Sequence, residues 1–170
     1  MSDLSDRFST EFREEHRAVR DGLLDLAGSF EQGDLDQARQ LLNQIAGLTG
    51  PHFRYEEEAL YPALVPIFGQ VHVESLYRDH DGAISGAQRL VELASQDSLT
   101  DADTREAVGL IQSILPHVSD CDGLSIMVER LDDDEVVRIF DARDQCLDAG
   151  LDLITWAQEI RKPPQLQPAG

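Results

Sequence analysis

The sequence predicts an all-α protein, built as an up-down-up-down four-helix bundle with an additional C-terminal helix. Apolar residues recur every three to four positions over long stretches, which is the spacing of an amphipathic helix, and no stretch shows a strand pattern. Leu, Ala, Glu, Asp and Arg dominate, while glycine and proline are sparse within the long stretches. The 170 residues, 41% of them hydrophobic, are enough for one domain with a buried core.

The first predicted helix covers residues 4–27, and glycines near position 30 mark the turn that follows it. Its apolar positions at helical spacing include Phe8, Phe12, Val19, Leu23 and Leu26. Asp34 is a typical N-cap residue and begins the second helix, which continues through Pro51 to about residue 68. Gly69 then ends this helix. Because the connection is short, the first two helices are expected to be antiparallel neighbours.

A third helix is predicted over residues 71–95, a loop over residues 96–101, and a fourth helix over residues 103–131. A fifth helical segment covers about residues 135–160. Residues 1–131 are therefore expected to form the bundle. Residues 132–162 should form an additional helix that packs on the bundle or mediates dimerisation, and residues 163–170 a flexible tail.

The charge is strongly acidic, with 33 acidic and 14 basic residues and a net charge of −19. Such a chain repels phosphate backbones and anionic lipid surfaces, so neither nucleic acid nor a membrane is expected as a partner. No apolar run is long enough to span a membrane, and the first residues lack the pattern of a secretory signal. Two cysteines are too few for a disulfide scaffold. The sequence therefore predicts a cytoplasmic protein.

Four of the five histidines fall one per predicted helix: His16, His52, His80 and His117. In antiparallel neighbours, equal distance from the shared turn means equal height. Counted in this way, neighbouring histidines differ in height by about two helical turns or less, so the four imidazoles are expected to meet near one level of the bundle. His72 lies just past a turn, and we expect it to be a surface residue at the end of the bundle.

A carboxylate accompanies the histidine of the second helix. Glu56 lies four residues after His52, on the same helical face, and bundle metal sites use a carboxylate and a histidine one turn apart. Pro51 and Pro116 each directly precede one of the histidines, and a proline inside a helix tends to kink it. Each residue also has a structural explanation, as a core histidine or a solvated acidic face. The joint pattern, however, favours a metal site.

These residues also carry a resemblance to a known family. The segment at residues 51–64, PHFRYEEEALYPAL, together with Glu15-His16 and Asp79-His80-Asp81, resembles the signature of the hemerythrin-like (HHE cation-binding) family. The resemblance covers most of the chain. It implies a hemerythrin-like four-helix bundle with a non-haem di-iron centre in its core. Within that centre it implies four terminal ligands and two bridging carboxylates: His16, His52, His80 and His117, with Glu56 and Asp122.

The sequence departs from the family pattern at two positions. Ile84 stands where hemerythrins proper carry another histidine, so an open position or a substitute such as Glu57 or Asp81 is expected. Cys121 stands four residues after the last histidine, where many relatives have glutamate, and is either a thiolate ligand or a buried thiol beside the site. Imidazole and carboxylate donors suit Fe, Mn or Zn, and the resemblance favours two irons.

Three functions fit this centre. The first is a binding or sensing protein for a small diatomic ligand (O₂ or NO) or peroxide. The second is an enzyme, a di-iron peroxidase, a catalase-like protein or an oxidase. The third is an interaction protein with a vestigial metal site, whose C-terminal helix offers an anchor surface formed by Leu147, Leu151, Ile154 and Trp156. A fold does not choose between these functions, because function depends on the site.

Overall fold

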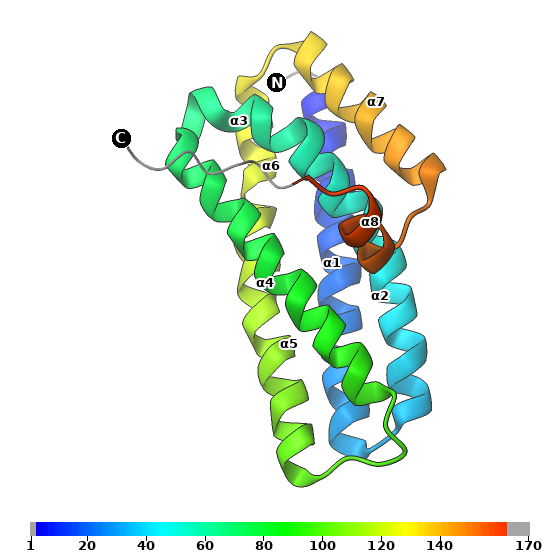
Figure 1. Ribbon diagram of the computed structural model, residues 1–170. Helices are drawn as coiled ribbons and strands as arrows, with labels where there is room; N and C mark the ends of the chain where they lie inside the picture. Colours follow the sequence, from blue (N-terminus) through cyan, green and yellow to red (C-terminus); the bar gives the residue numbers. More distant parts are fainter. Residues whose placement is uncertain (1–2, 163–170) are drawn as a thin grey trace.

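The computed structural model describes residues 3–162, and within that range every regular element is helical. Four long helices lie side by side in Figure 1: α1 (Asp3–Gln32), α2 (Leu35–Tyr55), α4 (Gln70–Ala94) and α5 (Asp101–Asp122). The chain reverses its direction at each connection between them. Helix α1 packs against α2 and α5, and α4 packs against the same two helices. The predicted all-α bundle is confirmed.

The second helix contains a wide turn at the level of the candidate ligands. Helix α2 stays helical through Pro51 and passes into a five-residue π-helix, η1 (Glu56–Leu60), and then into α3 (Tyr61–Phe68). A π-helical turn inside an α-helix is rare and is frequently found at functional sites. Here it begins at Glu56.

Helix α1 is longer than predicted, because its apolar stripe continues beyond residue 27. Phe30, four residues after Leu26, is fully buried, and the Ser29 hydroxyl donates to the carbonyl oxygen of Asp25. The turn comes at Gly33, one of the glycines that mark the predicted turn, and its φ of 71° lies in the left-handed region. Asp34 caps α2 as predicted and accepts a hydrogen bond from the Gln37 amide at 3.0 Å.

The C-terminal part is more divided than predicted. Helix α5 begins with a capping box at Thr100 and ends at Asp122, not near residue 131. It is followed by the short turns α6 (Leu124–Met127) and η2 (Val128–Arg130). The single C-terminal helix predicted beyond residue 132 is two helices, α7 (Asp133–Ala149) and α8 (Leu153–Glu159). They are separated by Gly150, which ends α7 in the left-handed conformation.

Helix α8 lies across α2 and α4 (Figure 1). Its Trp156 is only 1% exposed and packs in a cluster with Phe53, Ile84 and Leu153. The predicted anchor surface is therefore wrong at Trp156, because the bundle itself covers the indole. The predicted tail at residues 163–170 lies outside the described residues. No helix in the described part of the chain has the length and apolar character that crossing a membrane requires.

Two larger apolar clusters fill the bundle on either side of one polar level. One contains Phe8 and Phe12 of α1 with residues of α3 and α7, and the other contains Leu23 and Leu26 with Leu90. His16 lies between these two sets along α1. His52 on α2 and His80 on α4 lie between residues of the two clusters in the same way, so these three candidate ligands occupy the gap between the clusters.

Candidate metal centre

The centre of the site is the carboxylate of Glu56, which is completely buried. Its Oε1 oxygen lies 3.3 Å from His52 Nε2 and 4.0 Å from His16 Nε2. Its Oε2 oxygen lies 3.1 Å from His80 Nε2. The two oxygens of one carboxylate thus face imidazoles from three different helices.

The donor atoms form two groups that share Glu56. One atom from each of His16, Glu56 and Cys121 lies within 4.8 Å of the others, and the same holds for Glu56, His80 and His117. His52 stands beside the first group, with its ring centroid 4.5 Å from that of His16. His117 stands beside His80, with the ring centroids 4.9 Å apart. The four predicted imidazoles do meet at one level.

Each imidazole has its Nδ1 atom near an outer acceptor. His52 Nδ1 lies 2.6 Å from Glu15 Oε2, and His80 Nδ1 lies 2.8 Å from Glu57 Oε1. His16 Nδ1 lies 2.8 Å from the carbonyl oxygen of Phe12. His117 Nδ1 is 3.5 Å from Asp79 and makes no hydrogen bond among residues 3–162. An acceptor at Nδ1 fixes the tautomer that leaves Nε2 free to bind a metal.

The electrostatics show how strongly Glu56 depends on nearby positive charge. Burial disfavours a charged carboxylate, yet His52 and His80 hold the pKa of Glu56 well below its usual range. Burial likewise lowers the pKa of His52, but Glu56 and Glu15 reverse this and raise it to about 10. Burial and the charge of His52 lower the pKa of His16 to about 4. The buried carboxylate therefore needs positive charge beside it, and the imidazoles of His52 and His80 face its two oxygens.

A metal ion fits this arrangement. A metal cation would supply the positive charge that Glu56 needs, and it would bind neutral imidazoles in place of their protons. His52 Nε2 is buried and makes no aligned hydrogen bond with the described residues, which leaves a donor atom for such an ion. The donor set of imidazole nitrogens around a carboxylate suits Fe, Mn and Zn.

Cys121 and Asp122, the two predicted alternatives on the fourth helix, occupy different places. The Cys121 thiol is fully buried and donates a hydrogen bond to Glu56 Oε1 at 2.9 Å. Burial and the neighbouring Glu56 raise the pKa of this thiol well above its usual value. Asp122 lies at the edge of the site, and its Oδ1 oxygen is buried without a hydrogen-bond partner among the described residues. Cys121, not Asp122, lies among the donor atoms around Glu56.

The residues considered as substitutes for a histidine at position 84 face elsewhere. Ile84 packs in the apolar cluster around Trp156. Glu57 lies on the Nδ1 side of His80, and both Glu57 and Asp81 bind the guanidinium of Arg161. Arg161 therefore holds these two carboxylates outside the donor cluster.

A tyrosine takes part in the cluster instead. The Tyr61 hydroxyl lies 3.0 Å from His80 Nε2 and donates to Glu56 Oε2 at 3.4 Å. It is also 3.6 Å from the sulfur of Cys121. Sequence reasoning gave Tyr61 no role, although it lies five residues after Glu56. The π-helical turn between these two residues determines which way Tyr61 faces.

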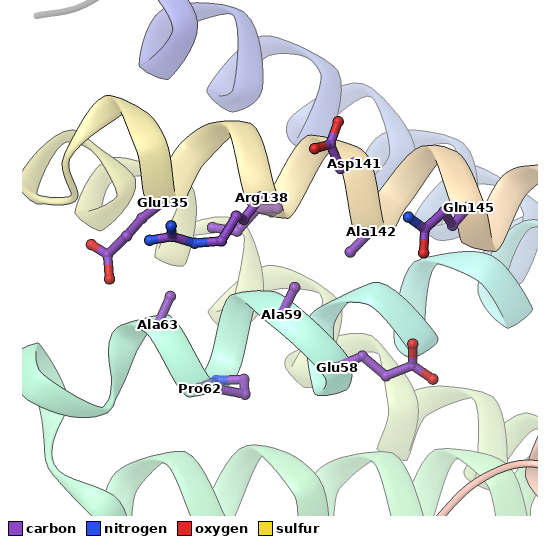
Figure 2. A pocket seen from close by; sticks show the side chains of 10 residues that line it. Glu58, Ala59, Pro62, Ala63, Glu135, Arg138, Asp141, Ala142 and Gln145 are labelled. Carbon is purple, nitrogen blue, oxygen red and sulfur yellow. The ribbon is translucent and has the colours of Figure 1, made fainter.

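His72 is exposed near the start of α4, as predicted, and lies apart from the cluster. A surface groove also lies apart from the cluster. Figure 2 shows this groove between η1 with α3 on one side, which carry Ala59 and Ala63, and α7 on the other, which carries Ala142. None of the candidate ligands lines it.

Two smaller hollows reach the edges of the centre. One contains His16 and Asp122, with Arg13, Arg17 and Arg20 of α1 at its rim. The other contains His117 with Asp79. His16 and His117 are slightly exposed, whereas Glu56 and His80 are fully buried. Each donor group can therefore be approached from solvent at one imidazole.

Comparison with known families agrees with this geometry. The family model described as "Hemerythrin HHE cation binding domain" matches residues 7–124, which contain all the candidate ligands. Comparison with curated proteins and with solved structures gave no match. The match covers more than half of the chain, and the chain therefore belongs to the hemerythrin HHE cation-binding family.

Proposed function

We propose that this metal-binding protein holds a pair of non-haem irons around Glu56 and binds or senses O₂, NO or peroxide there. The observation that carries the proposal is the position of Glu56, fully buried with one oxygen toward His16, His52 and Cys121 and the other toward His80. Such a carboxylate is suited to bridge two metal ions. Zinc and manganese fit the same donors, and the resemblance of the motif favours iron.

The chain's own residues would hold and serve this centre in distinct ways. His16, His52, His80 and His117 would be the terminal ligands, with Cys121 or Asp122 completing the set from α5. When bound, the metal pair supplies an open coordination position for a small ligand. The two hollows at His16 and His117 provide the routes by which such a ligand enters. The Tyr61 hydroxyl offers it a hydrogen-bond donor from inside the protein.

The metal content of purified variants tests this assignment. We expect His52→Ala and Glu56→Gln to lower the iron content sharply, because each removes a central donor, while His72→Ala leaves it unchanged. Circular dichroism of each variant checks that the helices remain. Equal iron content in all three variants, or none in the wild-type protein, would show that the ligand assignment is wrong.

A second candidate function is an enzyme that turns over peroxide or oxygen. It is favoured by the thiol of Cys121 and the phenol of Tyr61, two oxidisable side chains that both contact Glu56. Optical spectra of the iron-loaded protein separate the two functions. A stable spectral change after addition of NO or O₂ supports binding or sensing, whereas rapid consumption of peroxide supports an enzyme.

A further inference from the structure

Two arginines from the C-terminal helices reach the outer side of the candidate metal centre. Each holds a carboxylate that in turn holds the Nδ1 atom of a candidate ligand. Arg143 lies on α7 and binds Glu15, the partner of His52. Arg161 follows α8 and binds Glu57, the partner of His80. Both arginines lie beyond residue 124, outside the part of the chain that the family model matches.

The first of these contacts joins α7 to His52. Arg143 Nε donates to Glu15 Oε1 at 2.7 Å, and the other oxygen, Oε2, lies 2.6 Å from His52 Nδ1. Tyr55 also donates to Oε2, at 2.8 Å. The arginine therefore occupies one oxygen of Glu15 and turns the other toward the imidazole. Burial alone would raise the pKa of Glu15, but its bond with His52 and the charges of His52 and Arg143 lower it to about 2.

The second contact joins the end of α8 to His80. Arg161 Nη2 donates to Glu57 Oε1 at 2.9 Å, and the same oxygen lies 2.8 Å from His80 Nδ1. Arg161 is fixed on its other sides as well. Its Nη1 donates to Asp81 at 2.6 Å, and its guanidinium lies 5.8 Å from the ring centroid of Trp156. Only 8% of the Arg161 side chain is exposed, so this is a buried ion pair rather than a solvated one.

The other two imidazoles lack such an arrangement. His16 Nδ1 lies against a neutral carbonyl oxygen, and the Asp79 carboxylate near His117 is about half exposed. One arginine-bound carboxylate, Glu15, therefore contacts His52, which lies beside the donor group that contains His16 and Cys121. The other serves His80, in the donor group of His117.

A carboxylate at Nδ1 makes an imidazole a stronger donor at Nε2, and mutation of such partners typically changes metal affinity about 10–100-fold. An arginine on the far side of the carboxylate offsets part of its negative charge and holds it in position. We propose that Arg143 and Arg161 are positioning residues, through which α7 and α8 set the reduction potential of the metal centre. This inference rests on the proposed iron centre.

The test uses the full-length, iron-loaded protein and its reduction potential. Arg143→Gln and Arg161→Gln are each expected to shift the potential downward, because loss of a nearby positive charge favours the oxidised metal. Glu15→Gln and Glu57→Gln should shift it upward, since they remove negative charge, and should weaken Co²⁺ affinity on the order of 10–100-fold in chelator competition. A merely structural role would not give opposite signs.

Matched controls are available beside both arginines. Arg138 lies on α7 and Lys162 lies next to Arg161, and both side chains are exposed. Neither Arg138→Gln nor Lys162→Gln should therefore change the reduction potential. Arg143→Lys and Arg161→Lys keep the charge and should stay close to wild type. The proposal is overturned if the reduction potentials of the arginine-to-glutamine variants match those of these controls. It is also overturned if the potentials of the lysine variants fall as far as those of the glutamine variants. Wild-type protein that holds no iron would instead contradict the proposed function itself.

Discussion

A single buried carboxylate organises the candidate site at the scale of the residue. Glu56 has no solvent to stabilise its charge, so every polar group around it must do so. Three imidazole Nε2 atoms, one thiol and one phenol surround its two oxygens. The arrangement is costly for a protein without a cation and favourable for one that binds a metal.

Tyr61 gives a prediction at this scale. Its hydroxyl lies among Glu56, His80 and Cys121, so a small ligand that enters the cluster meets it. Tyr61→Phe should keep the iron content but weaken azide binding to the oxidised iron-loaded protein roughly fivefold, about 1 kcal/mol for one hydrogen bond. Azide titration followed by absorbance measures this. Tyr77→Phe is the control, because the Tyr77 hydroxyl donates to the Glu57 carbonyl oxygen. Equal azide affinity in wild type and Tyr61→Phe would exclude a role for the hydroxyl.

Part of this residue-level chemistry could be predicted from sequence. The positions of His16, His52, His80 and His117 along four helices set their heights, because the rise per residue is constant. The outer contacts could not be predicted in the same way. Arg143 and Glu15 are 128 residues apart, and no local rule links them. One signal was present, since Arg143 falls on the apolar stripe of Val136, Ile139 and Cys146, where an arginine needs a buried partner.

At the scale of the element, the packing of helix α8 on the bundle depends on one glycine. Gly50 lies in α2 where the chain between α7 and α8 passes directly over it. A Cβ atom on Gly50 would overlap the carbonyl oxygen of Leu151 and lie 2.8 Å from the Leu153 amide nitrogen. Backbone atoms cannot move aside as a flexible side chain can, so this contact requires glycine.

Gly50→Ala should therefore lower the free energy of unfolding by about 2 kcal/mol or more, by the cost of overpacking, and displace α8. Gly47→Ala is a matched control in the same helix, because a Cβ there meets nothing within 4 Å. It should be neutral or stabilise by about 0.5–1 kcal/mol. Urea denaturation measures both, and the fluorescence of Trp156 reports on α8. Equal stability of the two variants would contradict the close approach.

Element boundaries show where sequence patterns lose information. The spacing of apolar residues continues from Val136 through Ile160, so it predicted one helix over residues 135–160. Gly150 was the signal for the break, since it alone can end α7 in the left-handed conformation. The π-helical turn had no comparable signal, because an i→i+5 turn uses the same residue types as an α-helix.

At the scale of the whole molecule, two apolar clusters enclose the polar level from both ends of the bundle. Each cluster includes large, fully buried side chains, such as Phe12 in one and Leu26 in the other. The bundle therefore has enough apolar core to fold without metal, unlike small domains that need a metal to fold. A bound metal would add stability to this core.

Removal of metal should accordingly leave the helices intact but lower the melting temperature. Binding only to the folded state stabilises by about 2.7 kcal/mol when free metal is 100 times Kd. For a chain of this length we expect a fall on the order of 5–10 °C after chelation. Circular dichroism measures both quantities. Loss of the helical signal in chelator-treated protein would show instead that the metal is needed for folding, and an unchanged melting temperature would argue against tight binding.

The π-helical turn at Glu56 has a consequence for anyone who would redesign this bundle. It contains one residue more than a regular turn, so deletion of a single residue from it would restore an ordinary helix. Forcing all the present residues into regular α-helical geometry would instead rotate everything beyond the turn by about 100° relative to α2. Tyr61 and Leu64, both now fully buried, would then turn away from the interior. With its present residues, this segment therefore cannot form a regular α-helix and also keep Tyr61 and Leu64 buried. A design that starts from an idealised backbone would lose this packing.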